Sequence, residues 1–219
     1  MVDSVNVIGR GRVGSAIATR LAERGVELRN GDAELVLLCV PDRAIAEVAA
    51  SIAQGPWLAH VSGATPLAAL DPHERRFSVH PLQTFTLERG PEQLDGAWGA
   101  VTAEAPEARA LGRDLAETLG LHPFDLDDGD RTLYHAGASI ASNYLVTLYR
   151  AASLLLEDAG VPPEALIPLM TRTIENGFQL TGPIARGDWA VVDAHLDALN
   201  QAHPELEPMY RALAEATAA

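Results

Sequence analysis

The sequence predicts an α/β fold, in which a doubly wound parallel sheet is followed by an all-helical C-terminal region. Short apolar runs alternate with helical patterns through residues 1–128, and that alternation is typical of a parallel sheet. A glycine-rich turn joins the first run to the first helix. From residue 129 onward only helical patterns occur. We therefore expect two domains, 1–128 and 129–219.

The first domain contains six apolar runs that are typical of strands: 5–8, 26–29, 35–40, 57–61, 77–80 and 100–102. Helices are expected between them at 13–24, 44–53 and 107–119. The spacing of Val13, Ile17 and Leu21 places apolar side chains on one face of the first helix. Gly25 then ends it.

The connection between the second and third runs is unusually short. Only residues 30–34 separate them, and the helix that normally joins these strands does not fit there. The sheet is therefore expected to be shortened after its second strand.

The second domain is expected to hold helices at 132–158, 164–180, 189–200 and 205–217. The longest uncharged stretch, 132–149, contains His135, Ser139 and Ser142. It is too polar for a membrane span and suits a helix packed between other helices.

Composition excludes several kinds of chemistry. All 16 basic residues are arginine, so no lysine can form a Schiff base or act as a general acid. A proton donor must be histidine, tyrosine, a carboxylic acid or water. The net charge of −14 argues against nucleic acid as a partner. The histidines lack metal-ligand spacing, so no metal is expected. Cys39 is expected to be a buried thiol, and the absence of a visible signal peptide predicts a cytoplasmic protein.

Gly9, Gly11 and Gly14 form the pattern G-x-G-x-x-G between the first strand and the first helix, which indicates a Rossmann-like dinucleotide site. The helix N-terminus would favour a pyrophosphate. The alternative is a helix-start loop that binds nothing. The residues expected to contact a cofactor here are Gly9, Arg10, Gly11, Arg12, Val13 and Gly14, with Val40 and Pro41 after the third strand.

The adenosine side departs from the usual pattern. An acidic ribose ligand is expected at the end of the second strand, where Arg29 stands instead. Arg29 would pair with a 2′-phosphate and slightly favour NADP over NAD, or Asp32 would bind the ribose. The shortened connection is also consistent with loss of the cofactor.

Polar residues follow two later strands. His60 and Ser62 follow one, and His80 and Gln83 lie at the end of the next. Ligands of open α/β sheets bind at the carboxyl ends of strands, so these residues would face the glycine loop. His60 and Ser62 would line the cofactor, His80 would act in catalysis, and Gln83 would contact substrate. Alternatively, both histidines only satisfy loop backbone groups.

The helix at 132–158 places His135, Ser139 and Asn143 on one face. His135 and Asn143 would orient and protonate a substrate that Ser139 also contacts. Alternatively, these polar groups bond other helices or their own backbone. Further along the chain, Arg186 would bind a substrate carboxylate, and Asp188 suits the N-cap of the following helix.

Six motifs occur in order over nearly the whole chain: G-x-G-x-x-G, L-L-C-V-P-D (37–42), H-V-S-G (60–63), S-V-H-P-L-Q-T-F (78–85), Y-H-A-G-A-S-I-A-S-N-Y-L (134–145) and G-P-I-A-R-G-D (182–188). Together they resemble bacterial proteins that join a Rossmann-like domain to a C-terminal helical domain of unknown function. That family lies in the 6-phosphogluconate dehydrogenase-like superfamily. The resemblance implies NAD(P) binding, hydride transfer at a small carbonyl, hydroxy acid or imine, and a homodimer formed through the helical domain.

Two departures from those relatives matter: the shortened connection, and the lack of the lysine acid that ketopantoate reductases and β-hydroxyacid dehydrogenases use. His80, His135 or a water held by Asn143 would replace that lysine. The leading hypothesis is an NAD(P)-dependent oxidoreductase of a small molecule. The alternative is a non-catalytic dimer whose degenerate Rossmann domain binds a nucleotide or metabolite.

Overall fold

The computed structural model describes residues 2–218, and its internal contacts divide the chain between Ser142 and Asn143. The division falls after the helix α4 (Arg131–Ser139), although the composition changes near residue 128. The first turns of α4 therefore pack with the sheet. Each unit is described below by itself.

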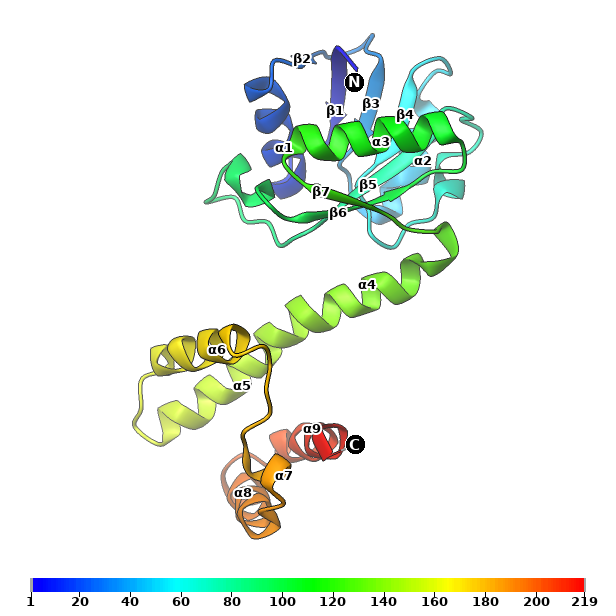
Figure 1. The fold of residues 1–219 in the computed structure, drawn as a ribbon. Helices are drawn as coiled ribbons and strands as arrows, with labels where there is room; N and C mark the ends of the chain where they lie inside the picture. Colours follow the sequence, from blue (N-terminus) through cyan, green and yellow to red (C-terminus); the bar gives the residue numbers. More distant parts are fainter. Residues whose placement is uncertain (1, 219) are drawn as a thin grey trace. The chain divides into compact units, whose positions relative to one another are not determined.

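The first unit is built on a seven-stranded sheet with the order β2-β1-β3-β4-β5-β6-β7 (Figure 1). The strands are β1 (Ser4–Ile8), β2 (Glu27–Leu28), β3 (Leu35–Leu38), β4 (Trp57–His60), β5 (Arg76–Leu82), β6 (Trp98–Thr102) and β7 (His122–Asp125). The sheet is parallel except that β6 runs antiparallel to β5. The predicted Rossmann-like fold class is thus confirmed.

Two details of the sheet differ from the prediction. The reversed direction of β6 was not expected, and β7 was not recognised as a strand. β7 has only four residues, and Pro123 lies within it opposite Gly99 of β6. A proline-containing edge strand carries little of the apolar signal on which sequence prediction depends.

Helices cover both faces of the sheet, as the continuous apolar runs require. The helices α1 (Arg12–Glu23) and α3 (Pro106–Leu119) cover one face, where they pack on a core that includes Val7, Leu37 and Phe77. The helix α2 (Ile45–Ser51) covers the other face at Val36, Leu38 and Leu58. Successive residues of a strand point to opposite faces, so the register carries this second face on to His60, Ser78 and His80.

The shortened connection is present as predicted, because β2 and β3 flank β1 and no helix lies between them. The connecting loop passes the amino end of β1. There the backbone N–H of Glu34 donates to Ser4 Oγ at 3.1 Å, and the N–H of Asp3 donates to the Glu34 carboxylate at 3.0 Å. This half of the sheet is therefore reduced to one short outer strand.

The predicted helix 132–158 is three elements in the structure. A π-helical turn, Ile140–Tyr144, separates α4 from α5 (Leu145–Asp158). The π turn shifts the helical phase, so the predicted common face of His135, Ser139 and Asn143 is interrupted.

The remaining helices of the second unit are α6 (Leu166–Glu175), α7 (Pro183–Arg186), α8 (Trp189–Ala202) and α9 (Glu207–Ala218). The helix α6 ends five residues earlier than predicted, and Gly177 follows with a φ of 67°. Within residues 2–218, no helix has the length and apolar character needed to cross a bilayer.

Candidate functional site

The candidate site lies where β1, β3, β4 and β5 end. These four strands are parallel to one another, so their carboxyl ends share one edge of the sheet. The glycine loop follows β1, the loop that begins at Val61 follows β4, and His80 lies near the end of β5. In sheets of this kind the carboxyl edge is the usual place for a ligand.

Two glycines of the loop are required by close packing. Gly9 has a φ of 98°, and a Cβ there would lie 2.4 Å from the Cys39 carbonyl oxygen. A Cβ on Gly14 would lie 1.9 Å from the Gly9 carbonyl oxygen. The loop is therefore pressed against the end of β3. Burial also raises the pKa of the Cys39 thiol to about 12, as expected for a packing residue.

Gly11 differs from its two neighbours, because a Cβ added to it would meet nothing within 4 Å. It is the N-cap residue of α1, and no side chain caps that helix or places an acidic group in its first turn. The N-terminal N–H groups of α1 thus face an open approach flanked by the exposed Arg10 and Arg12. This arrangement fits the pyrophosphate of a dinucleotide, for which glycine must leave room and the helix must supply donors.

The other residues assigned to a cofactor are placed differently. Val13 packs on the core, Val40 lies 3.2 Å from the Cβ position of Gly9, and Pro41 is exposed. Arg29 lines an open cleft of about 780 Å³ formed mainly by residues near the amino ends of β1, β3, β4 and β5. Its guanidinium donates to the Glu27 carboxylate at 2.6 Å. Neither Arg29 nor Asp32, which lines the same cleft, adjoins the glycine loop.

His60 and Ser62 are buried and serve the loop after β4. The backbone N–H of Ser62 donates to His60 Nδ1 at 3.2 Å, so that nitrogen is an acceptor. The Ser62 hydroxyl accepts from the N–H groups of Ala64 and Thr65. Burial, followed by the charge of Arg131, lowers the pKa of His60 to about 3, so the ring is neutral at pH 7. Both side chains have the loop-stabilising role that was the alternative reading.

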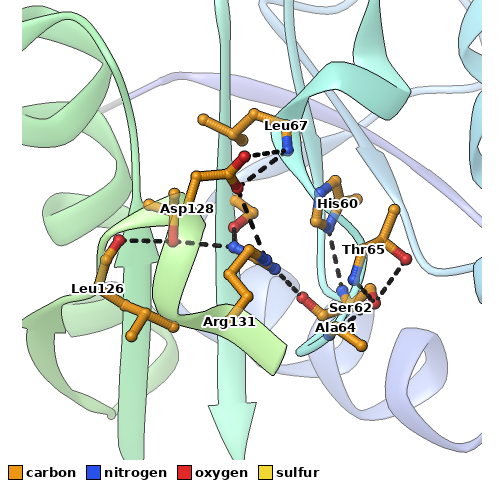
Figure 2. A network of polar contacts seen from close by, with 10 residues as sticks. His60, Ser62, Ala64, Thr65, Leu67, Leu126, Asp128 and Arg131 are labelled. Carbon is orange, nitrogen blue, oxygen red and sulfur yellow. Dashed lines mark hydrogen bonds and ion pairs between the residues drawn. The ribbon is translucent and has the colours of Figure 1, made fainter. Parts of the chain in front are cut away.

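A buried arginine ties three segments together at this edge (Figure 2). Arg131, at the start of α4, is 1% exposed. It donates to Ser78 Oγ at 2.7 Å, to Thr102 Oγ1 at 2.8 Å and to the Ser62 carbonyl oxygen. Asp128, which lies 3.8 Å from its Nε, also accepts from the N–H of Leu67. The start of α4 is thereby fixed to β5, to β6 and to the loop after β4.

One turn later, α4 brings two rings against His80. The Tyr134 hydroxyl lies 2.7 Å from His80 Nδ1, and the centroids of the His80 and His135 rings are 6.2 Å apart. The opposite edge of His80 faces Gly63, where an added Cβ would lie 2.9 Å from Nε2 and 2.8 Å from a carbon of His135. The loop after β4 therefore needs glycine to admit both imidazoles.

The electrostatic surroundings keep this cluster neutral. Burial, with smaller contributions from His135 and Arg131, lowers the pKa of His80 to about 4. Burial raises the pKa of the Tyr134 hydroxyl to about 12, although Arg131 opposes that change. At pH 7 the pair therefore consists of a neutral imidazole and a protonated phenol. The pair can donate and relay hydrogen bonds without carrying a charge of its own.

The structure brings together His60, His80 and His135, but not every predicted substrate residue. Gln83 is exposed and its side chain accepts from the N–H of Thr84. Ser139 is half-buried on α4, and Asn143 is exposed in the π turn. Within residues 2–218, no group of three or more histidine, cysteine or acidic side chains is arranged to hold a metal ion.

In the second unit, Arg186 is bound inside its own loop. Its guanidinium donates to the Asp188 carboxylate at 2.9 Å and to the Thr181 carbonyl oxygen at 2.5 Å. Asp188 is the N-cap residue of α8, as predicted, but its carboxylate pairs with Arg186 and does not cap the helix.

Sequence reasoning missed two central residues, Arg131 and Tyr134. Tyrosine was among the allowed proton donors, and Tyr134 directly precedes the predicted His135, so the signal was available. The spacing of Asp128 and Arg131 is typical of a helical ion pair, but such pairs are usually on the surface. Only the long-range contacts to Ser78 and Thr102 show that this arginine is buried.

Replacing Arg131 should strongly destabilise the first unit. Arg131→Met leaves the oxygens of Ser62, Ser78 and Thr102 without a buried donor, and we expect the free energy of unfolding to fall by about 3–5 kcal/mol. Urea unfolding measures the change. Arg113→Met removes an exposed arginine that pairs with Asp125 at 3.1 Å, and should cost about 1 kcal/mol or less. Equal effects of the two variants would contradict a structural role for the buried guanidinium.

Three solved structures share this fold. BF3122 from Bacteroides fragilis, named as a candidate NADP oxidoreductase, is 23% identical, covers 99% of this chain and 98% of that chain, and has a TM-score of 0.83. TM1727 from Thermotoga maritima is 25% identical, covers 98% of this chain and 100% of that chain, and has a TM-score of 0.73. The 1-pyrroline-5-carboxylate reductase of Streptococcus pyogenes is 15% identical, covers 98% and 96%, and has a TM-score of 0.62.

No curated protein matches the sequence. A family described as a domain of unknown function, DUF2520, matches residues 97–217, which include β6, β7 and nearly all of the helical region. That match spans more than half of the chain. The protein therefore belongs to the DUF2520 family.

Proposed function

We propose that this protein is an NAD(P)-dependent oxidoreductase that acts on a small carbonyl, hydroxy acid or imine. The observation that carries the proposal is the open approach at Gly11. Gly9 and Gly14 press the loop against β3, whereas Gly11 leaves space directly in front of the uncapped N-terminus of α1. The His80 and Tyr134 pair lies at the same edge of the sheet.

The structural neighbours support the same class of function. BF3122 is named as a candidate NADP oxidoreductase, and the protein from S. pyogenes is named as a reductase. A shared fold alone does not establish an activity, so the proposal depends on the glycine loop and on the site chemistry.

The residues of the glycine loop would hold the pyrophosphate, with Arg10 and Arg12 beside it. The nicotinamide, when bound, exchanges a hydride with a carbon of the substrate. His80 would then exchange a proton with the substrate atom bonded to that carbon. His135 would orient the substrate from the other side of Gly63. The loop that carries Ser62 stays rigid because Arg131 holds its backbone.

Asn143, Ser139, Gln83 and Arg186 stay predictions as substrate contacts. A preference for NADP likewise depends on Arg29, whose guanidinium would have to leave Glu27 to reach a 2′-phosphate.

A second candidate function is a non-catalytic protein that binds a nucleotide or metabolite. The six-residue connection between β2 and β3 favours it, because it removes the helix that normally supports the adenosine half of the site. The two functions differ in a simple respect: this second one predicts binding of a ligand without turnover.

We also propose that the protein is a homodimer formed through its helical unit. Large apolar side chains of this unit are exposed on successive helices, among them Leu145 and Leu148 on α5 and Ile167, Leu169 and Ile174 on α6. Exposed apolar residues in this number typically mark an interface between chains.

Gly11→Ala should weaken NADPH binding without affecting folding, because its Cβ would occupy the space assigned to the pyrophosphate. We expect the Kd to rise about tenfold or more and the Tm to stay unchanged. Calorimetric titration and thermal unfolding measure the two effects. Gly129→Ala, which also adds a methyl group in open space, is the matched control. Unaltered affinity in Gly11→Ala would place the cofactor elsewhere, and failure of both NADH and NADPH to bind the wild type at millimolar concentration would refute the oxidoreductase proposal.

His80→Ala should abolish turnover of any substrate that the wild-type protein reduces or oxidises. Loss of a general acid typically costs about 10²–10⁴ in rate. The Kd for NADPH should stay within about twofold of the wild-type value, because His80 is not part of the glycine loop. Steady-state kinetics and calorimetry provide the comparison. Undiminished turnover would remove His80 from the mechanism.

Leu169→Asp should convert a dimer into monomers, because it places a charge on the exposed apolar surface of α6. Leu87→Asp makes the same change at a leucine of the first unit that is 70% exposed, and should leave the dimer intact. Light scattering coupled to size-exclusion chromatography gives the mass of each. A monomeric wild-type protein would contradict the proposal directly.

A further inference from the structure

We infer that the site around His80 is built for an oxygen-centred substrate, a carbonyl that is reduced or a hydroxyl that is oxidised, and not for an imine. The inference rests on the proposed function and narrows it. It assigns Tyr134 a role as a positioning and proton-relay residue behind His80. Three observations support it: the hydrogen bond between Tyr134 and His80, the packing of His80 on Gly63, and the buried charge of Arg131.

The position of Tyr134 is determined by two sets of contacts. Arg131, three residues earlier on α4, is bound to β5, β6 and the loop after β4. The Tyr134 ring also packs on Phe124 of β7, with their centroids 6.0 Å apart. The hydroxyl is thereby held 2.7 Å from His80 Nδ1. A hydroxyl held in this way can select one tautomer of the imidazole.

In the arrangement we infer, the Tyr134 hydroxyl donates to Nδ1 and the single ring proton of His80 is on Nε2. Both groups are in the required state at pH 7, since the pKa is about 4 for His80 and about 12 for Tyr134. The Nε2 edge is the one that faces Gly63, at the carboxyl end of β4. The donor thus faces the edge of the sheet where a ligand is expected, and Tyr134 stands behind it.

The charge near this donor is positive. The guanidinium of Arg131 lowers the pKa of His60, His80 and Tyr134. Its ion-pair partner Asp128 is 3.8 Å away and partly exposed, so water screens the compensating negative charge. Within residues 2–218, no carboxylate is hydrogen-bonded or ion-paired to the site residues His60, His80, Tyr134 or His135.

A positive field distinguishes the two reactions. Hydride addition to a carbonyl places negative charge on oxygen, and a positive charge with neutral donors stabilises that charge. Reduction of an imine requires a protonated, positively charged nitrogen, which Arg131 would destabilise. Acid strength points the same way. An alkoxide is a stronger base than tyrosinate and can take its proton, whereas an imine nitrogen is a weaker base and cannot.

The proton transfer in the carbonyl reaction balances. As the carbonyl carbon accepts a hydride from the reduced nicotinamide, the C=O electron pair moves to oxygen, which takes the proton from Nε2 of His80. Nδ1 takes the phenolic proton of Tyr134, and the tyrosinate regains a proton from water. The imidazole stays neutral throughout and ends in the other tautomer, and one proton from water is consumed for each hydride transferred.

The first test needs neither cofactor nor substrate. In the ¹⁵N NMR spectrum of the full chain, His80 should show an unprotonated Nδ1 and a protonated Nε2, and should stay neutral down to about pH 4. Tyr134→Phe should release this preference and give a mixture of tautomers. Tyr210→Phe is a matched control, because Tyr210 forms a similar 2.7 Å bond with His195 in the second unit. A His80 that is positively charged at pH 7, or protonated at Nδ1, would overturn the inference.

The second test compares substrates with NADPH present: aldehydes and ketones, including cyclopentanone, against the imine 1-pyrroline. We expect turnover of carbonyl compounds, with the kcat reduced about tenfold or more in Tyr134→Phe and the KM little changed. Faster reduction of 1-pyrroline than of any carbonyl would overturn the inference while leaving the oxidoreductase proposal in place. Absence of NADPH binding would remove that proposal instead, and the tautomer of His80 would still be decided by NMR.

Discussion

The buried guanidinium of Arg131 is the interaction on which the rest of the site depends. Removing an arginine from water costs several kcal/mol unless its donors are satisfied, and here Ser62, Ser78 and Thr102 supply oxygens from three separate segments. The same contacts connect α4 to the sheet, which is why Tyr134 and His135 reach His80. Arginine suits this position because its planar fork of donors can satisfy several acceptors at once.

Local signals were sufficient to predict most of the first unit. The glycine spacing, the alternating runs and the short connection after β2 are properties of neighbouring residues, and the structure confirms them. β7 and the direction of β6 were missed because strand pairing depends on contacts between distant segments. The π turn at Ile140–Tyr144 was missed for a related reason, because residues of ordinary helical propensity form it.

The candidate site shows the same limit. Placement of polar residues after strands brought His60 and His80 to one edge, as parallel strands require. Their roles could not be separated by sequence: His60 accepts from its own loop, whereas His80 is bonded to a tyrosine 54 positions away. Arg29 illustrates the opposite error, because its position after β2 suggested a ribose contact while its guanidinium is bound to Glu27.

The two outer strands have a consequence for assembly. An exposed strand edge invites pairing with another chain, and proteins usually protect such edges. Here β2 offers only two residues, and Pro123 removes a backbone donor from the four-residue β7. Sheet extension, the route to strand exchange and fibrous aggregation, is therefore blocked at both ends. The shortened connection that weakens the adenosine half of the fold also protects the sheet against growth along its edge.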